Sequence, residues 1–404
     1  MTELTKEDIM LAAEADAALA ETYAKIDAIA LANTDRVMKA FANNRISEMH
    51  FQASTGYGYD DPGREAIEKI YAEVFGTEAA LVRHTIVNGT QALTIGLFGL
   101  LRPGDTLLSV TGKPYDTLEE VIGLTGEAGN GSLKDFGVNY RQCEIDEDFT
   151  GMLDETVKVV YVQRSRGYGQ RRALSPEEIN KITDYVHANS NAFVMVDNCY
   201  GEFTCESEPR ADLIVGSLIK NPGGGIALTG GYLAGSKRAV ELASYRMTSP
   251  GVGGEVGCTL GQNRNILQGF FMAPHIVAQA MKTAAFAAYL YEKAGYEVSP
   301  TYAEERYDLI QTLTLRSPEK LCRFCEEIQY SSPVDAHVTP APWAMPGYTD
   351  QVIMAAGTFT GGATSELSAD APMREPYTVF MQGALTFESG KLAILRTLKG
   401  MPKA

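Results

Sequence analysis

The chain has 404 residues, with 35 lysines and arginines against 51 aspartates and glutamates, so its formal net charge at pH 7 is −16. Apolar residues make up 45% and charged residues 21%, a composition typical of globular proteins that excludes intrinsic disorder, a collagen-like repeat and a small disulfide scaffold. The acidic balance argues against nucleic acid as a partner, because binding to phosphate backbones needs a basic face.

Residues 1–50 are predicted to form an N-terminal helical arm. Thr5 and Asp8 fit a capping box, and an alanine-rich stretch without glycine or proline follows. The acidic start lacks the apolar core of a signal peptide, and no uncharged apolar stretch reaches the roughly 20 residues that a membrane span needs. We therefore expect a cytoplasmic protein with no membrane partner.

Residues 51–270 are predicted to form a large domain. It starts with a loop rich in glycine and tyrosine over residues 54–63. In Arg64–Phe75 apolar residues recur every three or four positions, which predicts a helix that ends at Gly76.

Short apolar strands then alternate with helices. The predicted strands are Thr106–Val110, Val157–Val162, Ala192–Asp197, Leu213–Ser217 and Gly231–Gly235. Continuous apolar strands between helices indicate an α/β fold with a mainly parallel sheet covered by helices, in which ligands bind at the carboxyl ends of the strands. Residues 271–404 are expected to form a smaller C-terminal α+β domain.

Six scattered cysteines do not suggest a disulfide framework, and a reducing compartment is the simpler interpretation. Cys322 and Cys325 form a lone CxxC pattern. A zinc site would need a second pair of ligands at suitable spacing, so we interpret the two cysteines as neighbours on one helix face and expect no metal.

Two polar residues follow predicted strands and are candidates for chemistry. Asp197 ends an apolar strand, where an acid points into the cleft, although it would also suit a turn or a helix cap. Lys220 lies between a strand and three consecutive glycines, which allow the backbone to approach a ligand closely. A lysine in a desolvated cleft has a lowered pKa and can form a Schiff base, but a loop lysine beside a flexible turn fits the pattern too.

A third candidate is the segment Asn88–Thr90 at the start of an apolar helix. Free N–H groups and the helix dipole make such a terminus a phosphate site, although a plain helix cap has the same sequence. Pyridoxal 5′-phosphate needs the three features together, because its aldehyde takes a lysine, its pyridinium nitrogen an acid and its phosphate a helix N-terminus.

Six stretches of the chain carry a further signal. They are Leu100–Asp105, Pro114–Gly123, Gln163–Tyr168, Val196–Phe203, Ser217–Gly225 and Glu366–Asp370. Through them nearly the whole chain resembles the aluminium-resistance or methionine γ-lyase-like proteins, relatives of the cystathionine lyases. The resemblance implies the fold-type-I architecture of pyridoxal phosphate enzymes.

The resemblance also implies roles for single residues. Lys220 would hold the cofactor and act as the base at Cα, Asp197 would pair with the pyridinium, and Tyr115 would stack on the ring. Gly89 and Thr90 would bind the phosphate, with Asn88 capping their helix and Ser217 completing the site. The contact to the cofactor 3′-oxygen would come from the region Gln163–Arg166.

Two further residues follow from the same resemblance. Tyr57 would reach the phosphate from a neighbouring subunit, so a homo-oligomer, either a dimer or a tetramer with shared active sites, is part of the prediction. Arg374 would bind the substrate carboxylate, a task that suits a bidentate guanidinium. It also fits a surface arginine beside Glu375.

The chain departs from the family at three positions. Asn88 stands where the family usually has serine, and asparagine can still cap the helix and donate a hydrogen bond. Gln91 stands where the family usually has histidine, which would alter one face of the cofactor if that histidine contacts the ring. Ile219 stands where the cystathionine lyases carry threonine, which removes one hydroxyl from the phosphate site. These changes leave cofactor binding plausible and put the substrate in doubt.

The resulting hypothesis is a pyridoxal phosphate-dependent carbon–sulfur lyase. It would act by β- or γ-elimination on a small-molecule amino-acid substrate that contains sulfur, such as cystathionine or methionine. The alternatives are another reaction of the same cofactor, such as transamination, retro-aldol cleavage or racemisation, and a non-catalytic protein linked to metal tolerance.

Overall fold

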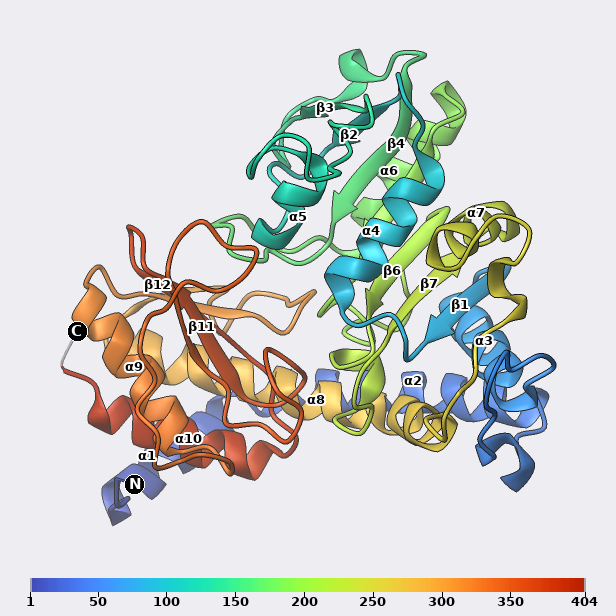
Figure 1. The fold of residues 1–404 in the computed structure, drawn as a ribbon. Helices are drawn as coiled ribbons and strands as arrows, with labels where there is room; N and C mark the ends of the chain where they lie inside the picture. Colours follow the sequence, from blue (N-terminus) through green and yellow to red (C-terminus); the bar gives the residue numbers. More distant parts are fainter. Residues whose placement is uncertain (1, 403–404) are drawn as a thin grey trace.

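The computed structural model describes residues 2–402, which form two sheets and ten α-helices (Figure 1). The first sheet contains β1 (Ala79–Arg83), β2 (Thr106–Ser109), β3 (Asn139–Gln142), β4 (Val157–Gln163), β5 (Phe193–Asp197), β6 (Leu213–Ser217) and β7 (Gly231–Gly235). The second contains β8 (Glu297–Ser299), β9 (Gln311–Thr314), β10 (Val352–Ala355), β11 (Ser368–Pro372) and β12 (Thr378–Gln382).

The helices cover both sheets. They are α1 (Lys6–Ala18), α2 (Ala20–Asn43), α3 (Pro62–Phe75), α4 (Gly89–Leu100), α5 (Asp116–Ile122), α6 (Pro176–Asn189), α7 (Lys237–Met247), α8 (Asn263–Lys293), α9 (Pro318–Tyr330) and α10 (Phe387–Gly400). Four short 3₁₀ helices are also present: η1 (Glu48–Phe51), η2 (Thr150–Met152), η3 (Asn221–Gly223) and η4 (Gly253–Glu255).

The larger sheet confirms the predicted α/β class. Its strand order is β1-β7-β6-β5-β4-β2-β3, and every neighbouring pair from β6 to β3 is parallel. Strand β7 runs against both β6 and β1. The register places Gln163 at the end of β4 beside Asp197 at the end of β5, so the carboxyl ends of the parallel strands share one edge.

Alternation along the strands explains why helices lie on both faces of this sheet. In β6, Leu213 and Val215 belong to the apolar cluster that contains α4, whereas Ile214 belongs to the cluster that contains α3 and part of α8. Successive side chains of a strand point to opposite faces, so a strand that is apolar throughout must be covered twice.

The smaller sheet has the order β10-β11-β12-β9-β8, and all its pairs are antiparallel. Ala369 and Ala371 of β11 pack into the apolar core formed with α9 and α10. Cys322 and Cys325, both free thiols, lie on α9 against this core, as predicted. Within residues 2–402, no group of three or more potential metal ligands is found, and no helix is long and apolar enough to cross a membrane.

The predicted N-terminal arm consists of two helices that break at Leu19. The capping box of Thr5 and Asp8 is present. Figure 1 shows α2 beside the long helix α8, while α1 lies near α10 of the smaller domain. The expected boundary between residues 270 and 271 falls inside α8, which therefore belongs to both halves of the molecule.

Candidate active site

A pocket of about 310 Å³ lies between the carboxyl edge of the larger sheet and the smaller sheet. From the first half of the chain it is lined by Asn88, Gly89, Thr90, Leu93, Tyr115, Thr117, Gln163, Ser165, Gly167, Tyr168, Asp197, Cys199, Tyr200, Ser217, Ile219 and Lys220. From the second half it is lined by Ile310, Pro346, Tyr348, Met354, Ala363, Asp370, Phe380 and Gln382. Seven of the nine residues predicted for the site therefore line one cavity.

The N-terminus of α4 opens into this pocket. Asn88 is the helix cap, and its side-chain oxygen accepts a hydrogen bond from the N–H of Gln91 at 2.8 Å. The N–H groups of Gly89 and Thr90, in the first turn, have no partner within the helix. A Cβ on Gly89 would lie 3.3 Å from the sulfur of Cys199, so glycine leaves this terminus close to the residues beneath it.

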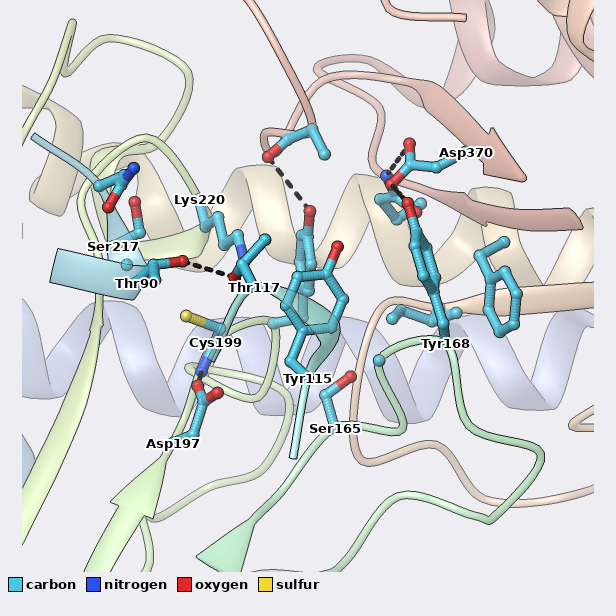
Figure 2. A pocket seen from close by; sticks show the side chains of 18 of the residues that line it. Thr90, Tyr115, Thr117, Ser165, Tyr168, Asp197, Cys199, Ser217, Lys220 and Asp370 are labelled. Atoms are coloured by element: carbon cyan, nitrogen blue, oxygen red, sulfur yellow. Dashed lines mark hydrogen bonds between the residues drawn. The ribbon is translucent and has the colours of Figure 1, made fainter. Parts of the chain in front are cut away.

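Ser217 ends β6 beside the same helix terminus. Its hydroxyl oxygen is buried and has no hydrogen-bond partner, which is costly unless a further group binds there. Thr90, on the other side, forms a hydroxyl–hydroxyl contact of 2.7 Å with Thr117 (Figure 2). The helix terminus thus presents unpaired hydrogen-bond donors to one point of the pocket.

Asp197 lies at the floor of the pocket, buried at the end of β5. One carboxylate oxygen accepts from the N–H of Cys199 at 3.1 Å, and the other accepts from the hydroxyl of Tyr161 at 3.3 Å. Two donors from different elements hold the carboxylate in one orientation, so the acid is fixed before any ligand arrives.

Lys220 follows β6 and is partly buried in the pocket. Its ammonium nitrogen lies 4.3 Å from the centre of the Tyr200 ring. Burial lowers the pKa of Lys220, but the neighbouring acidic groups of Cys199 and Tyr200, followed by Asp197 and Glu202, outweigh burial and raise it above its usual value. The expected lowering was therefore wrong, because the prediction considered desolvation without the acids that face the amine.

The glycines after Lys220 allow the backbone of this loop to approach the backbone of α8 closely. A Cβ on Gly224, whose φ is +53°, would lie 2.2 Å from the carbonyl oxygen of Gly269 in α8. In return, a Cβ on Gly269 would lie 2.2 Å from the carbonyl oxygen of Gly223. Helix α8 and the 3₁₀ turn η3 after the lysine therefore touch backbone to backbone, and this contact fixes the lysine loop.

Comparison with known proteins identifies relatives over nearly the whole chain. The family model for methionine γ-lyase matches residues 8–402. The uncharacterized protein YnbB of Bacillus subtilis is 49% identical over 403 residues, which cover 97% of this chain and 95% of that protein. A carbon–sulfur lyase involved in aluminium resistance from Clostridium novyi NT has a crystal structure that superimposes with a TM-score of 0.93 at 48% identity, covering 98% of this chain and 96% of that one.

The chain belongs to the methionine γ-lyase family. Its architecture is that of the fold-type-I enzymes. A pyridoxal-5′-phosphate-dependent protein, YhfS from Escherichia coli, has the same fold at 18% identity, with a TM-score of 0.59 over 93% of this chain and 96% of that one. The smaller antiparallel sheet completes this fold.

Two of the nine predicted site residues, Tyr57 and Arg374, do not line the pocket of this methionine γ-lyase family member. Tyr57 is 74% exposed and stacks on Tyr59, with 5.6 Å between ring centres. Arg374 forms ion pairs with Asp350 at 2.9 Å and Asp116 at 3.3 Å, so its guanidinium is already engaged by two carboxylates. The structure brings neither residue to the other seven.

Tyr115 lies in the middle of the pocket and caps α5. Its hydroxyl contacts the hydroxyl of Tyr348 at 2.8 Å, and its N–H donates to the side chain of Gln163 at 2.7 Å. Its ring centre lies 5.3 Å from that of Tyr168. Three tyrosines from distant segments therefore form one aromatic wall.

The three departures from the family have different surroundings, and Asn88 caps α4 as expected. The side chain of Gln91 accepts a hydrogen bond from the N–H of Val87 at 2.7 Å and does not line the pocket, so it leaves the cofactor face unchanged. Ile219 does line the pocket. In the region Gln163–Arg166, Gln163 and Ser165 line the pocket, whereas Arg164 pairs with buried Glu208.

Sequence reasoning missed the wall that the smaller domain supplies. Asp370, Met354 and Phe380 come from neighbouring strands β11, β10 and β12, and Tyr348 comes from the preceding loop. Asp370 lies in one of the stretches that carry the family resemblance, but no feature of the sequence predicted it as a site residue. No periodicity or motif signals that a strand of another domain faces the cofactor cleft.

Proposed function

We propose that this protein is a pyridoxal phosphate-dependent carbon–sulfur lyase that acts on a sulfur-containing amino acid such as cystathionine or methionine. The observation that carries the proposal is the meeting of Lys220 and Asp197 in one pocket with the N-terminus of α4. Membership of the methionine γ-lyase family supports the type of reaction.

The residues present fit the cofactor. The unpaired Ser217 oxygen and the first-turn N–H groups of Gly89 and Thr90 are suited to a phosphate, which takes donors only. Asp197 would hold the pyridine nitrogen and Lys220 the aldehyde carbon. Tyr115 would lie against the ring.

When bound, pyridoxal phosphate supplies a sink for the electrons released at Cα. Asp197, held by Cys199 and Tyr161, would keep a proton on the ring nitrogen. The amine of Lys220, in its neutral form, would accept the Cα proton as general base. Loss of a thiolate from Cβ or Cγ, followed by hydrolysis, would yield a thiol, a 2-oxo acid and ammonia.

The proposal includes a homo-oligomer. Tyr57, in the loop before α3, projects into solvent, where it would be available to the phosphate site of a second copy. A dimer or tetramer with shared active sites would account for two neighbouring exposed tyrosines, Tyr57 and Tyr59, on a protein surface.

Purified protein with added cofactor tests the function. We expect a visible absorbance band from cofactor bound to Lys220, and release of both thiol and 2-oxo acid from at least one member of a panel of sulfur amino acids. Lys220→Ala should lose the band and lower turnover by about 10⁴-fold or more, because it removes both the attachment point and the base. A variant that keeps colour and turnover, or a requirement for a keto-acid acceptor, would overturn the proposal.

A further inference from the structure

Asp370 occupies the centre of the pocket wall that the smaller domain supplies. In the antiparallel register it lies opposite Met354 of β10 on one side and Phe380 of β12 on the other, and all three residues line the pocket. Every residue of β11 is buried. A carboxylate in the middle of a buried strand, between two apolar side chains, is expensive to keep, which indicates a function.

The carboxylate is held by neutral donors. One oxygen accepts from the hydroxyl of Tyr168 at 3.3 Å, and the other accepts from the side-chain amide of Gln382 at 3.2 Å. Among the described residues, no lysine, arginine or histidine lies within ion-pair distance of it, and Lys220 acts on its charge only from farther away. The residue is 4% exposed, so its carboxylate is largely desolvated, and the positive charge that acts on it from a distance is that of Lys220.

The other charges of the pocket are already assigned. The described residues of the lining include one cationic side chain, Lys220, and one acid besides Asp370, which is Asp197. Both belong to the cofactor under the proposed function. Arg374 is held outside the lining by Asp116 and Asp350. The charge that remains to face a substrate is therefore the negative charge of Asp370.

Position agrees with this assignment. Figure 2 shows Asp370 and Tyr168 on the opposite side of the pocket from Thr90 and Ser217, with Tyr115 between the two groups. The phosphate site and the buried acid are thus at opposite ends of the cavity. A substrate attached near Lys220 would extend its side chain toward the smaller domain.

We propose that Asp370 binds an ammonium group on the side chain of the substrate, so that the enzyme selects amino acids with a second amino group over apolar thioethers. This inference rests on the proposed lyase function and names its substrate class. A thioether with an amino group on its far side would qualify, whereas methionine, which ends in a methyl group, would not.

The chemistry of the wall suits such a group. An ammonium donates charge-assisted hydrogen bonds to a carboxylate, which are about twice as strong as neutral ones. Met354 and Phe380 offer apolar surface to the methylene groups that lead to the ammonium. An apolar side chain of equal length would leave the acid buried and unpaired, which disfavours its binding.

Two isosteric pairs of amino acids test the proposal by equilibrium binding to the cofactor-loaded enzyme. L-ornithine is compared with L-norleucine, and L-lysine with L-2-aminoheptanoate, by calorimetry. None has a leaving group on Cβ or Cγ, so binding is measured whether or not the enzyme cleaves carbon–sulfur bonds. We expect the ammonium member of at least one pair to bind about tenfold more tightly or better.

Asp370→Asn should remove this preference, and Asp335→Asn, an exposed acid of the same domain, should keep it. Equal or tighter binding of the apolar member in both pairs would overturn the proposal, as would a preference that survives in Asp370→Asn. The wild-type ratios decide the matter even if that variant does not fold. Failure of the lyase function itself would appear separately, as a lack of thiol release from sulfur amino acids.

Discussion

The two walls of the pocket differ in how their polar groups are satisfied. On the wall of the larger domain, the Ser217 hydroxyl is buried without a partner and the first turn of α4 presents free N–H groups. On the wall of the smaller domain, Asp370 has neutral donors on both oxygens, but among the described residues no cation forms an ion pair with it, and Lys220 acts on its charge only from a distance. The first wall lacks an acceptor and the second lacks a cation.

This difference separates two tasks of the same cavity. Unpaired donors suit an anion of fixed shape that stays bound, such as a phosphate. A buried acid with its hydrogen bonds made but its charge unpaired suits a cation that comes and goes with each substrate. Substitutions on the first wall should therefore affect cofactor binding and chemistry, and substitutions on the second should affect substrate choice and the dependence of stability on pH.

After that of Lys220→Ala, the largest expected effect is that of Asp197→Asn. The amide keeps the shape of the side chain but cannot keep a proton on the ring nitrogen, so we expect kcat/KM to fall by about 10²–10³-fold, with an altered visible spectrum of the bound cofactor. Asp212→Asn, which lies before β6 at the other edge of the sheet, is the control. Unchanged kcat/KM and spectrum in Asp197→Asn would remove this acid from the chemistry.

The next effect concerns Asp370 and the stability of the fold. Burial raises the pKa of its carboxyl from 3.8 to about 6, while hydrogen bonds from Gln382 and Tyr168 and the positive charge of Lys220 oppose the rise. Between those two pH values the folded state binds more protons than the unfolded state, so stability falls as pH rises, by about 3 kcal/mol in total. The cost is fully present above pH 6 and absent below about pH 4.

Asp370→Asn removes the titration, so it should be more stable than wild type at pH 8 by up to about 3 kcal/mol and lose that advantage toward pH 4. Denaturant unfolding from pH 4 to pH 8 measures this, with Asp335→Asn as the control. A difference between variant and wild type that does not change with pH would contradict the assignment of a buried, uncompensated charge to this wall.

The smallest effect, and the most selective, is that of Ser217→Ala. A hydrogen bond to a charged group contributes about 1.5–3 kcal/mol, so cofactor affinity should fall by about ten- to a hundredfold. Stability without cofactor should hardly change, because this hydroxyl has no partner in the protein. Ser332→Ala should do the opposite, since its hydroxyl is buried outside the pocket and donates to the carbonyl oxygen of Ile328 at 2.9 Å. Similar losses of stability in both variants would contradict the division between the walls.

Much of the first wall was predictable from sequence because its signals are local. A polar cap before an apolar helix marks Asn88, an acid after an apolar strand marks Asp197, and glycines after a strand mark Lys220. Parallel strands bring such endings to one edge, so a position along the chain translates directly into a position in space.

The second wall was not predictable, because its composition depends on register between strands and on how two sheets face each other. Met354, Asp370 and Phe380 become neighbours only through the antiparallel pairing of β10, β11 and β12. The prediction for the pKa of Lys220 was wrong for a similar reason. The acidic groups that raise this pKa lie at and after the end of β5, and they approach the amine only in the folded chain.

The contact between Gly224 and Gly269 has a consequence for how this protein can change over generations. Each glycine presses on the main chain of the other element, and a main chain cannot step aside as a flexible side chain does. A glycine inside a helix lowers the stability of the helix by about 1 kcal/mol relative to alanine, so Gly269 makes α8 less stable than alanine would. Neither glycine can be replaced without a clash with the other element. The loop that carries Lys220 and a helix that begins some forty residues further along the chain therefore constrain each other's sequence during evolution.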